Sequence, residues 1–239
     1  MIVLAFSASA YAGDMTADEL IAKHVAAIGG EKALKAVESV YLEGKMFMQG
    51  AQLDTRAYII PPNKGFMEIL MNGAVVGGAA SNGKEAWQTQ MGQTFYLEGE
   101  MKEKIESQMM LFPLLDYKDR SCTVEYQGEE MVKGKNAYKL VYATPTGDTT
   151  QYYFDTESFY IVKESAADAA SNLSDYKKVG DVLFAHKITT ASQQGRVMIT
   201  YDSVATNVTI PDSLFVMPAD AKPLPKMPGM PPAEEKEGK

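Results

Sequence analysis

The sequence predicts a mainly β (α+β) protein, a curved antiparallel sheet whose concave face is covered by a central helix. Roughly a dozen short segments alternate apolar and polar residues, and turn-forming residues separate them at hairpin spacing. A sheet with that many strands curls or closes on itself. The run 100–117 has helical periodicity instead, and an isolated helix of this length needs an apolar surface to dock on.

Composition sets the protein class. The chain has 239 residues, of which 46% are apolar and 23% charged, and this is ordinary for a soluble globular domain. The net charge of −8 comes without a basic stripe, so we expect no nucleic-acid partner. Cys122 is the single cysteine, and His24 and His186 lie far apart. We therefore expect no disulfide within the chain, no metal site and no cofactor.

The first residues are typical of a secretory signal. Residues 1–12, MIVLAFSASAYA, contain a short apolar run and end in the small-x-small pattern Ala10-Tyr11-Ala12. We expect residues 1–12 to be a signal-peptide remnant and residues 13–218 to form a single domain. No run approaches the ~20 apolar residues that span a membrane, so we expect an exported, soluble protein.

A capped helix is predicted over residues 16–28. Thr16 and Glu19 have the capping-box spacing, and Gly29-Gly30 ends the helix. Its apolar stripe consists of Leu20, Ile21, Val25 and Ile28. His24 lies one residue off the stripe, so a position at the boundary of the buried face is expected. Residues 31–37 are predicted as a second short helix.

Strands are predicted from residue 39 onward, where the period changes to two. Before the central helix they cover residues 40–48, 53–60, 65–71, 74–80, 85–90 and 94–97. After it they cover residues 122–127, 137–143, 149–154, 160–165, 173–177, 182–189 and 197–203. Asn72-Gly73 is the strongest hairpin signal. Residues 210–218 are predicted as an apolar latch, and the Pro-, Lys- and Glu-rich residues 219–239 as a disordered tail.

The central helix is the candidate lid of the concave face. Met101, Ile105, Met109 and Phe112 fall on one helical face, and Pro113 is predicted to end the helix. Such a stripe is also typical of ordinary core. The 15 methionines favour the lid interpretation, because methionine is common on surfaces that re-pack around varied apolar partners.

No catalytic motif is present, neither a nucleophile elbow nor a phosphate or dinucleotide fingerprint. Cys122 is predicted to be a small buried hydrophobe, and His186 to face inward. Asp116 and Asp119 are interpreted as solvated loop carboxylates. Trp87 and the run 152–154 either line a pocket or pack as ordinary strand residues. The sequence therefore does not indicate an enzyme.

Five segments carry a resemblance to a known family. They are LIAKHVAAIGGEKALKAVESV at 20–40, WQTQMG at 87–92, YYFDTESFYIVKE at 152–164, LSDYKKVGDVLFAHKI at 173–188 and DSLFVMP at 212–218. In this order they resemble the LolA-like proteins, the periplasmic outer-membrane lipoprotein-sorting family, in a branch other than that of its well-studied carrier. The match covers about residues 18–218.

The resemblance implies an incomplete β-barrel with the N-terminal and central helices packed in its concave face. It also implies a soluble periplasmic carrier that binds the acyl chains of lipoproteins or lipids. The family's carrier holds its lid with an arginine on an early strand. Arg56, Arg120 and Arg196 are the candidates here, and Arg56 lies on an early strand among neighbours that depart from the family pattern.

On this interpretation the lid and the wall of the binding face are apolar. The predicted lid residues are Ile105, Met109, Met110 and Phe112, and the predicted wall residues are Met46, Met48, Met67, Ile69, Met71 and Trp87. The expected partners are an acylated lipoprotein or lipid and a membrane-bound loading or acceptor protein, with the chain itself a monomer. The alternative function is a periplasmic regulatory or sensor module that binds lipid or a protein without transporting it.

Overall fold

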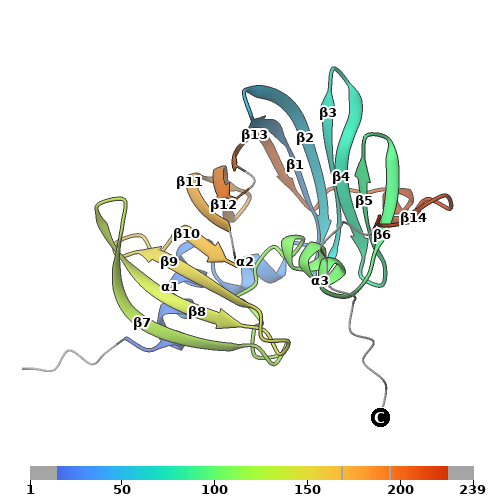
Figure 1. The fold of residues 1–239 in the computed structure, drawn as a ribbon. Helices are drawn as coiled ribbons and strands as arrows, with labels where there is room; N and C mark the ends of the chain where they lie inside the picture. Colours follow the sequence, from blue (N-terminus) through green and yellow to red (C-terminus); the bar gives the residue numbers. More distant parts are fainter. Residues whose placement is uncertain (1–14, 168, 194, 226–239) are drawn as a thin grey trace, which may run out of the picture.

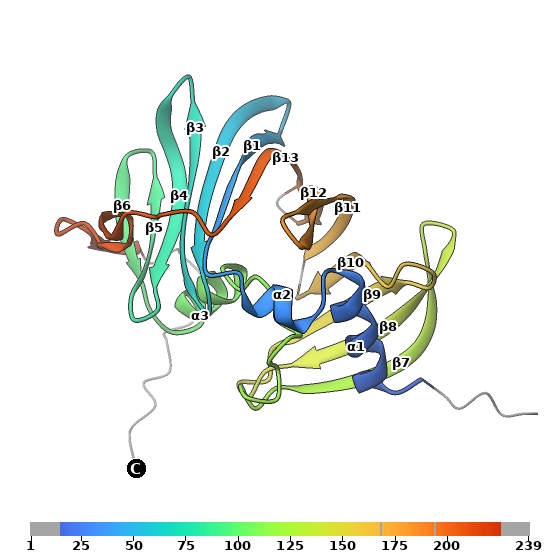
Figure 2. The same cartoon turned by 180° about the vertical axis from the view of Figure 1, so that it is seen from behind.

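A computed structural model describes residues 15–167, 169–193 and 195–225. The predicted signal remnant, residues 1–12, lies outside the described residues. Within the described ranges the chain forms one 14-stranded sheet, three α-helices and one 3-10 helix (Figures 1 and 2). The mainly β, open and curved architecture that the sequence predicts is confirmed.

The helices are α1 (Ala17–Ala27), α2 (Glu31–Lys35), α3 (Gly99–Gln108) and the 3-10 helix η1 (Asp212–Phe215). The strands before α3 are β1 (Val40–Met48), β2 (Ala51–Ile60), β3 (Lys64–Met71), β4 (Ala74–Asn82), β5 (Ala86–Gln90) and β6 (Gln93–Leu97). Those after it are β7 (Thr123–Val132), β8 (Lys135–Ala143), β9 (Thr149–Asp155), β10 (Ile161–Ala166), β11 (Ala169–Val179), β12 (Val182–Ser192), β13 (Gly195–Thr206) and β14 (Lys222–Pro223). Each predicted strand overlaps one observed strand.

The sheet is a meander that folds back on itself once. Its order is β14-β6-β5-β4-β3-β2-β1-β13-β12-β11-β10-β9-β8-β7, so β13 joins the N-terminal hairpins to the C-terminal ones. Every neighbouring pair is antiparallel except β14 and β6. Strands β7–β10 form one lobe and β1–β6 with β13 the other, with β11 and β12 between them (Figure 1). The edges β7 and β14 do not meet, so the barrel is incomplete.

Strand register defines one continuous inner face, because directly paired residues of antiparallel strands lie on the same side of a sheet. On β1 this face carries Val40, Leu42 and Met46, which pair with Ile59, Ala57 and Leu53 of β2. A buried cluster forms where α2 packs on it through Leu34, with Val37 just beyond the helix. Helix α2 therefore lies on the inner, concave side of the sheet.

Helix α1 forms for the predicted reason. The Thr16 backbone N–H donates to Glu19 Oε2 at 2.8 Å, and the Glu19 N–H donates to Thr16 Oγ1 at 3.2 Å, a complete capping box. Leu20 and Ile21 pack with Leu140 and Phe154 of the β7–β10 lobe. Leu20 and Ile21 thus anchor the N-terminal helix to the β7–β10 lobe, while Val25 packs on the cluster of β1, β2 and α2.

His24 departs from its predicted boundary position. Its side chain is buried, its Nδ1 lies 2.9 Å from the Phe159 carbonyl oxygen, and its ring meets the edge of Phe154 at 5.2 Å. The helix docks against the lobe over a wider arc than its aliphatic stripe indicates. Burial lowers the pKa of His24 from 6.5 to about 4, although the bond to Phe159 opposes this.

The central helix is shorter than predicted. Helix α3 ends at Gln108, with Met109 as its C-cap, rather than at Pro113. None of its residues is fully buried, because polar residues fill most of its surface. The apolar residues that follow leave the helix and cover the inner face in a non-helical form.

The C-terminus corrects the predicted extent of the tail. Phe215 is buried, as expected for the apolar latch, and η1 packs on β3 and β4. Residues 219–225 are not a disordered tail, since Lys222 and Pro223 pair in parallel with Phe95 and Tyr96 of β6. A free strand edge on β6 accepts backbone pairing whatever the composition of the added strand. The remainder of the predicted tail, residues 226–239, lies outside the described residues.

Candidate functional site

The candidate site is the inner face and the residues that cover it, here called the cover segment, residues 109–117. Met109, Leu114 and Tyr117 are buried. The segment contributes to the cores of both lobes. Leu111, Phe112 and Leu115 pack on the cluster of β1, β2 and α2, whereas Leu114 and Tyr117 belong to the cluster of α1 and β7–β10.

Met109 packs directly against the backbone of β3. A Cβ added at Gly65 of β3 would lie 2.4 Å from Met109 Sδ and 2.9 Å from Met109 Cβ. Only a glycine gives the side chain this room. Phe112 lies further along, with its ring 6.0 Å from that of Phe184 on β12. The middle of the cover segment is therefore held by apolar packing.

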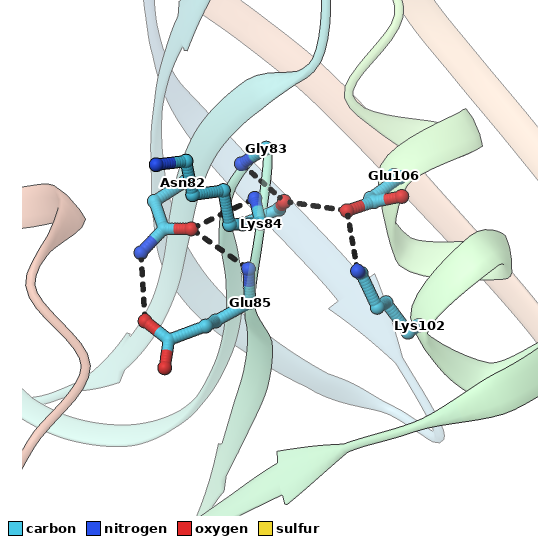
Figure 3. Close-up of polar contacts among 7 residues, drawn as sticks. Asn82, Gly83, Lys84, Glu85, Lys102 and Glu106 are labelled. Atoms are coloured by element: carbon cyan, nitrogen blue, oxygen red, sulfur yellow. Dashed lines mark hydrogen bonds and ion pairs between the residues drawn. The ribbon is translucent and has the colours of Figure 1, made fainter.

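Polar contacts hold α3 at the first end of the segment. The Ser81 hydroxyl of β4 donates to Glu106 Oε1 at 3.3 Å and accepts from the Gly83 N–H at 3.0 Å. Lys102 Nζ lies 3.8 Å from the same Glu106 oxygen. Figure 3 shows Glu106 and Lys102 on α3 facing the turn at Gly83. Ser81 is fully buried, so this tether holds α3 at the inner face.

The same turn is stiffened by Asn82. Its Oδ1 accepts from the backbone N–H groups of Lys84 and Glu85, at 3.0 and 2.8 Å (Figure 3). Its Nδ2 donates to Glu85 Oε2 at 3.1 Å and to the Phe215 carbonyl at 3.4 Å. The hydrogen bond from Ser81 to Glu106 therefore starts from a turn that Asn82 holds in place.

The second end of the segment is held by α1. The Tyr117 hydroxyl donates to the Asp18 carboxylate, and Lys118 Nζ lies 3.0 Å from Asp18 Oδ2. The hydrogen bond from Tyr117, followed by that from Lys118, lowers the pKa of Asp18. Both ends are thus pinned by polar groups, and the apolar middle crosses the inner face between them.

One of the three candidate arginines touches the segment. Arg120 Nη2 donates to the carbonyl of Pro113, and its Nε is buried without a hydrogen-bond partner among the described residues. Arg56 instead pairs with Glu68 at 2.6 Å on the outer face. Arg196 is exposed at the start of β13. The sequence did not single out Arg120, because the family resemblance implies an arginine on an early strand.

The predicted wall residues fall into two groups. Met46, Met48, Met67, Ile69 and Met71 lie on the inner face, as their pairing and alternation require. Trp87 is buried on the opposite face, where it pairs with Ala80 and Tyr96. The structure therefore does not bring Trp87 together with the other five. Strand alternation predicts which residues of one strand share a face, but not which face of a neighbouring strand they join.

The inner-face wall residues differ in exposure. Met67 packs beneath the cover segment, and Met46 is buried beside Leu53. Met48 and Met71, at the far ends of β1 and β3, are 37% and 47% exposed. Among the predicted lid residues, Met109 is buried and Ile105, Met110 and Phe112 are half-buried. Apolar surface therefore continues beyond the cover segment toward solvent.

The other residues considered for chemistry have structural roles. Cys122 and His186 are buried, as predicted. The Tyr142 hydroxyl donates to Cys122 Sγ at 3.0 Å, and His186 Nδ1 lies 3.0 Å from the Phe184 carbonyl. Asp116 pairs with Lys35 at 3.3 Å near the surface.

Two surface pockets lie away from the predicted site. One, of about 580 Å³, lies beside α1, α2 and the β11–β12 turn, and the other, of about 470 Å³, lies on the outer face around Arg56 and Asp54. None of the ten predicted site residues lines either pocket. In this conformation the cover segment itself occupies the inner face.

Within the described residues, no group of His, Cys, Asp and Glu side chains is arranged to hold a metal ion. None of the helices in this described part of the chain is long and apolar enough to cross a membrane.

Solved structures with the same architecture identify the fold. A DUF1329 family protein from Desulfovibrio piger matches 83% of this chain and 96% of its own, with a TM-score of 0.60 and 11% identity. A LolA superfamily protein from Nitrosomonas europaea matches 84% and 98%, with a TM-score of 0.58 and 10% identity. The fold is LolA-like. The LolA-like expectation of an open sheet with helices in its concave face is confirmed.

A third LolA-like structure carries a functional description of its own. It is a domain from Vibrio parahaemolyticus described as a candidate outer membrane lipoprotein-sorting protein, with a TM-score of 0.59, 10% identity, and coverage of 82% of this chain and 94% of that one. No protein-family model matches the sequence, and no curated protein matches it. At these identities the likeness concerns the fold.

Replacing Gly65 by alanine tests how the cover segment is seated. The added Cβ collides with Met109, so we expect the segment to lift and the hydrogen-bonded amides of Met109 and Leu115 to exchange about tenfold faster. Hydrogen exchange read by mass spectrometry measures this. Gly77→Ala is the matched control, because its Cβ meets nothing closer than 3.7 Å. Equal exchange in both variants would show that Met109 does not hold the segment in place.

Proposed function

We propose that this protein is a soluble periplasmic carrier that binds acyl chains of lipoproteins or lipids on its inner face, in outer-membrane lipoprotein sorting. The observation that carries the proposal is the cover segment, an apolar stretch that fills the concave face of a LolA-like sheet and belongs to both lobes. The lipoprotein-sorting description of the Vibrio parahaemolyticus structure supports the same function. The proposed activity is binding and release, without a chemical reaction.

The energetics suit reversible exchange. The cover segment buries Met109, Leu114 and Tyr117, and it partly buries Met110, Leu111, Phe112 and Leu115. At ~1.5–3 kcal/mol for each fully buried side chain this is on the order of 10 kcal/mol. A long acyl chain gains a similar amount at ~0.8 kcal/mol per CH₂. An acyl chain can therefore replace the segment with a small net change in free energy.

The geometry offers a route for this exchange. Met48 and Met71 are exposed at the far end of the inner face, next to the buried Met46 and Leu53. An acyl chain that first contacts the exposed methionines would advance along the strands toward Met67 and displace the segment. The flexible thioether side chains adapt to chains of different shape.

Native mass spectrometry of the protein purified from periplasm without detergent, with lipid extraction of the same sample, tests the proposal. We expect a bound lipid or acylated peptide, and we expect Ile105→Asp and Met109→Asp each to lower its occupancy at least about tenfold, because a carboxylate beside the apolar ligand is left desolvated. Met91→Asp is the matched control, since Met91 is 93% exposed in the β5–β6 turn. Circular dichroism establishes that each variant is folded.

A protein that stays free of lipid after incubation with lipid vesicles would overturn the carrier proposal. The cover segment would then be ordinary core, and a module that binds a protein partner would be the better function. Equal loss of ligand in the Met91→Asp control would instead indicate a nonspecific effect of added charge.

A further inference from the structure

A polar row crosses the inner face between the two lobes. Successive strand pairs place Val197, Thr190, Ser171, Glu164, Tyr152 and Leu140 in one line across β13, β12, β11, β10, β9 and β8. Val197 pairs with Met48 of the proposed binding face, so the line continues that face. Polar groups occupy its middle and apolar groups both ends.

Glu164 is the unusual member of this row. It is half-buried, and none of the described residues donates a hydrogen bond to it or forms an ion pair with it. Burial raises the pKa of its carboxyl group. Tyr152 and Tyr176 both lie close enough for Glu164 to raise their pKa values. A carboxylate taken from water without a cation is costly, and such a group is typical of a site that awaits its partner.

The neighbours of Glu164 extend the set of hydrogen-bond acceptors. The Ser171 and Thr190 hydroxyls bond to each other at 2.9 Å, which leaves lone pairs on both oxygens. On the other side, the positive charge of Arg120 acts on both Tyr152 and Tyr142. The row therefore offers acceptors around Glu164 and a guanidinium, with its free buried Nε, beyond Tyr152.

We propose that this row is the head-group subsite of the carrier and that it selects a phospholipid with a primary ammonium group. The ammonium has three N–H donors, which match the Glu164 carboxylate and the two hydroxyls, while its phosphate faces the Arg120 side. The acyl chains extend from the row along the apolar residues that begin at Val197 and Met48. This inference rests on the proposed function, because it names the lipid class that the same face takes.

The test is competitive loading. The purified full chain is incubated with vesicles that contain equal amounts of phosphatidylethanolamine and phosphatidylcholine with identical acyl chains, and native mass spectrometry counts each bound lipid. The two head groups differ in N–H donors, since the choline nitrogen has none. We expect phosphatidylethanolamine to be bound about tenfold more often. Glu164→Gln is expected to bring the ratio close to one while total occupancy persists.

Two further variants keep the result interpretable. Glu157→Gln changes an exposed glutamate of the β9–β10 loop and is expected to leave the ratio unchanged. Ser171→Ala removes one acceptor and is expected to lower the ratio about threefold, which tests the row even if Glu164→Gln fails to fold. Equal binding of both lipids by the unaltered protein, or a preference that survives Glu164→Gln and Ser171→Ala, overturns the inference alone. Binding of neither lipid overturns the carrier proposal with it.

Discussion

Replacing Gly44 by alanine is expected to destabilise the protein by about 3 kcal/mol. Gly44 lies at the register shift between β1 and β13, the antiparallel pairing that joins the N-terminal hairpins to the C-terminal ones. A Cβ there would lie 2.0 Å from the Thr200 carbonyl oxygen and 2.8 Å from the Tyr201 Cα. Both are backbone atoms, so no side-chain rotation relieves the collision and the two strands must separate.

Urea denaturation followed by circular dichroism measures this effect. Gly77→Ala is the matched control, because it is the same substitution in a strand with no contact closer than 3.7 Å, and we expect its stability to change by less than about 0.5 kcal/mol. Equal stability of the two variants would show that the junction between β1 and β13 adapts to the added methyl group.

Acidification is expected to destabilise the protein through His24 by about 3 kcal/mol between pH 6.5 and pH 4. The folded chain keeps His24 neutral, because burial lowers its pKa to about 4, whereas the unfolded chain takes up a proton near pH 6.5. The unfolded state therefore binds more protons than the folded state inside this window. Protonation stabilises the unfolded state, so the free energy of unfolding decreases as the pH falls. Above pH 6.5 the contribution is fully present.

The measurement compares unfolding free energies from pH 7 to pH 4 for the unaltered protein and His24→Gln. Glutamine does not titrate and retains a donor for the Phe159 carbonyl, so its curve should be flatter by about 3 kcal/mol across the window. Burial raises the pKa of Glu164, which acts in the opposite direction because the folded state then favours the protonated acid. The difference between the two curves isolates His24, and parallel curves would contradict its assigned role.

Local pattern was sufficient for most of the elements. The capping box at Thr16 forms as expected, because it depends on residues three apart. Each strand from β1 to β13 overlaps a segment that the sequence pattern predicts, whereas β14 was missed, and Asn72-Gly73 does form the turn between β3 and β4. The end of α3 could not be predicted from local pattern, since a helix continues only where tertiary packing supports it. The cover segment instead packs in a non-helical form on Gly65 and Phe184.

Periodicity in the sequence alone determined that this chain forms a large antiparallel sheet with two helices ahead of it and one between its halves. Alternation also groups Met46 with Met48 on one face of β1, and the wall candidates of β3 on one face of that strand, because side chains alternate along a strand. Only the tertiary structure decided that Trp87 faces away, that Arg120 meets Pro113, and that Glu164 lies in line with Ser171 and Tyr152. Those relations connect residues of different segments, which no helical or strand period links. They depend on strand order and register, which bulges and long-range pairing set after the local elements have formed.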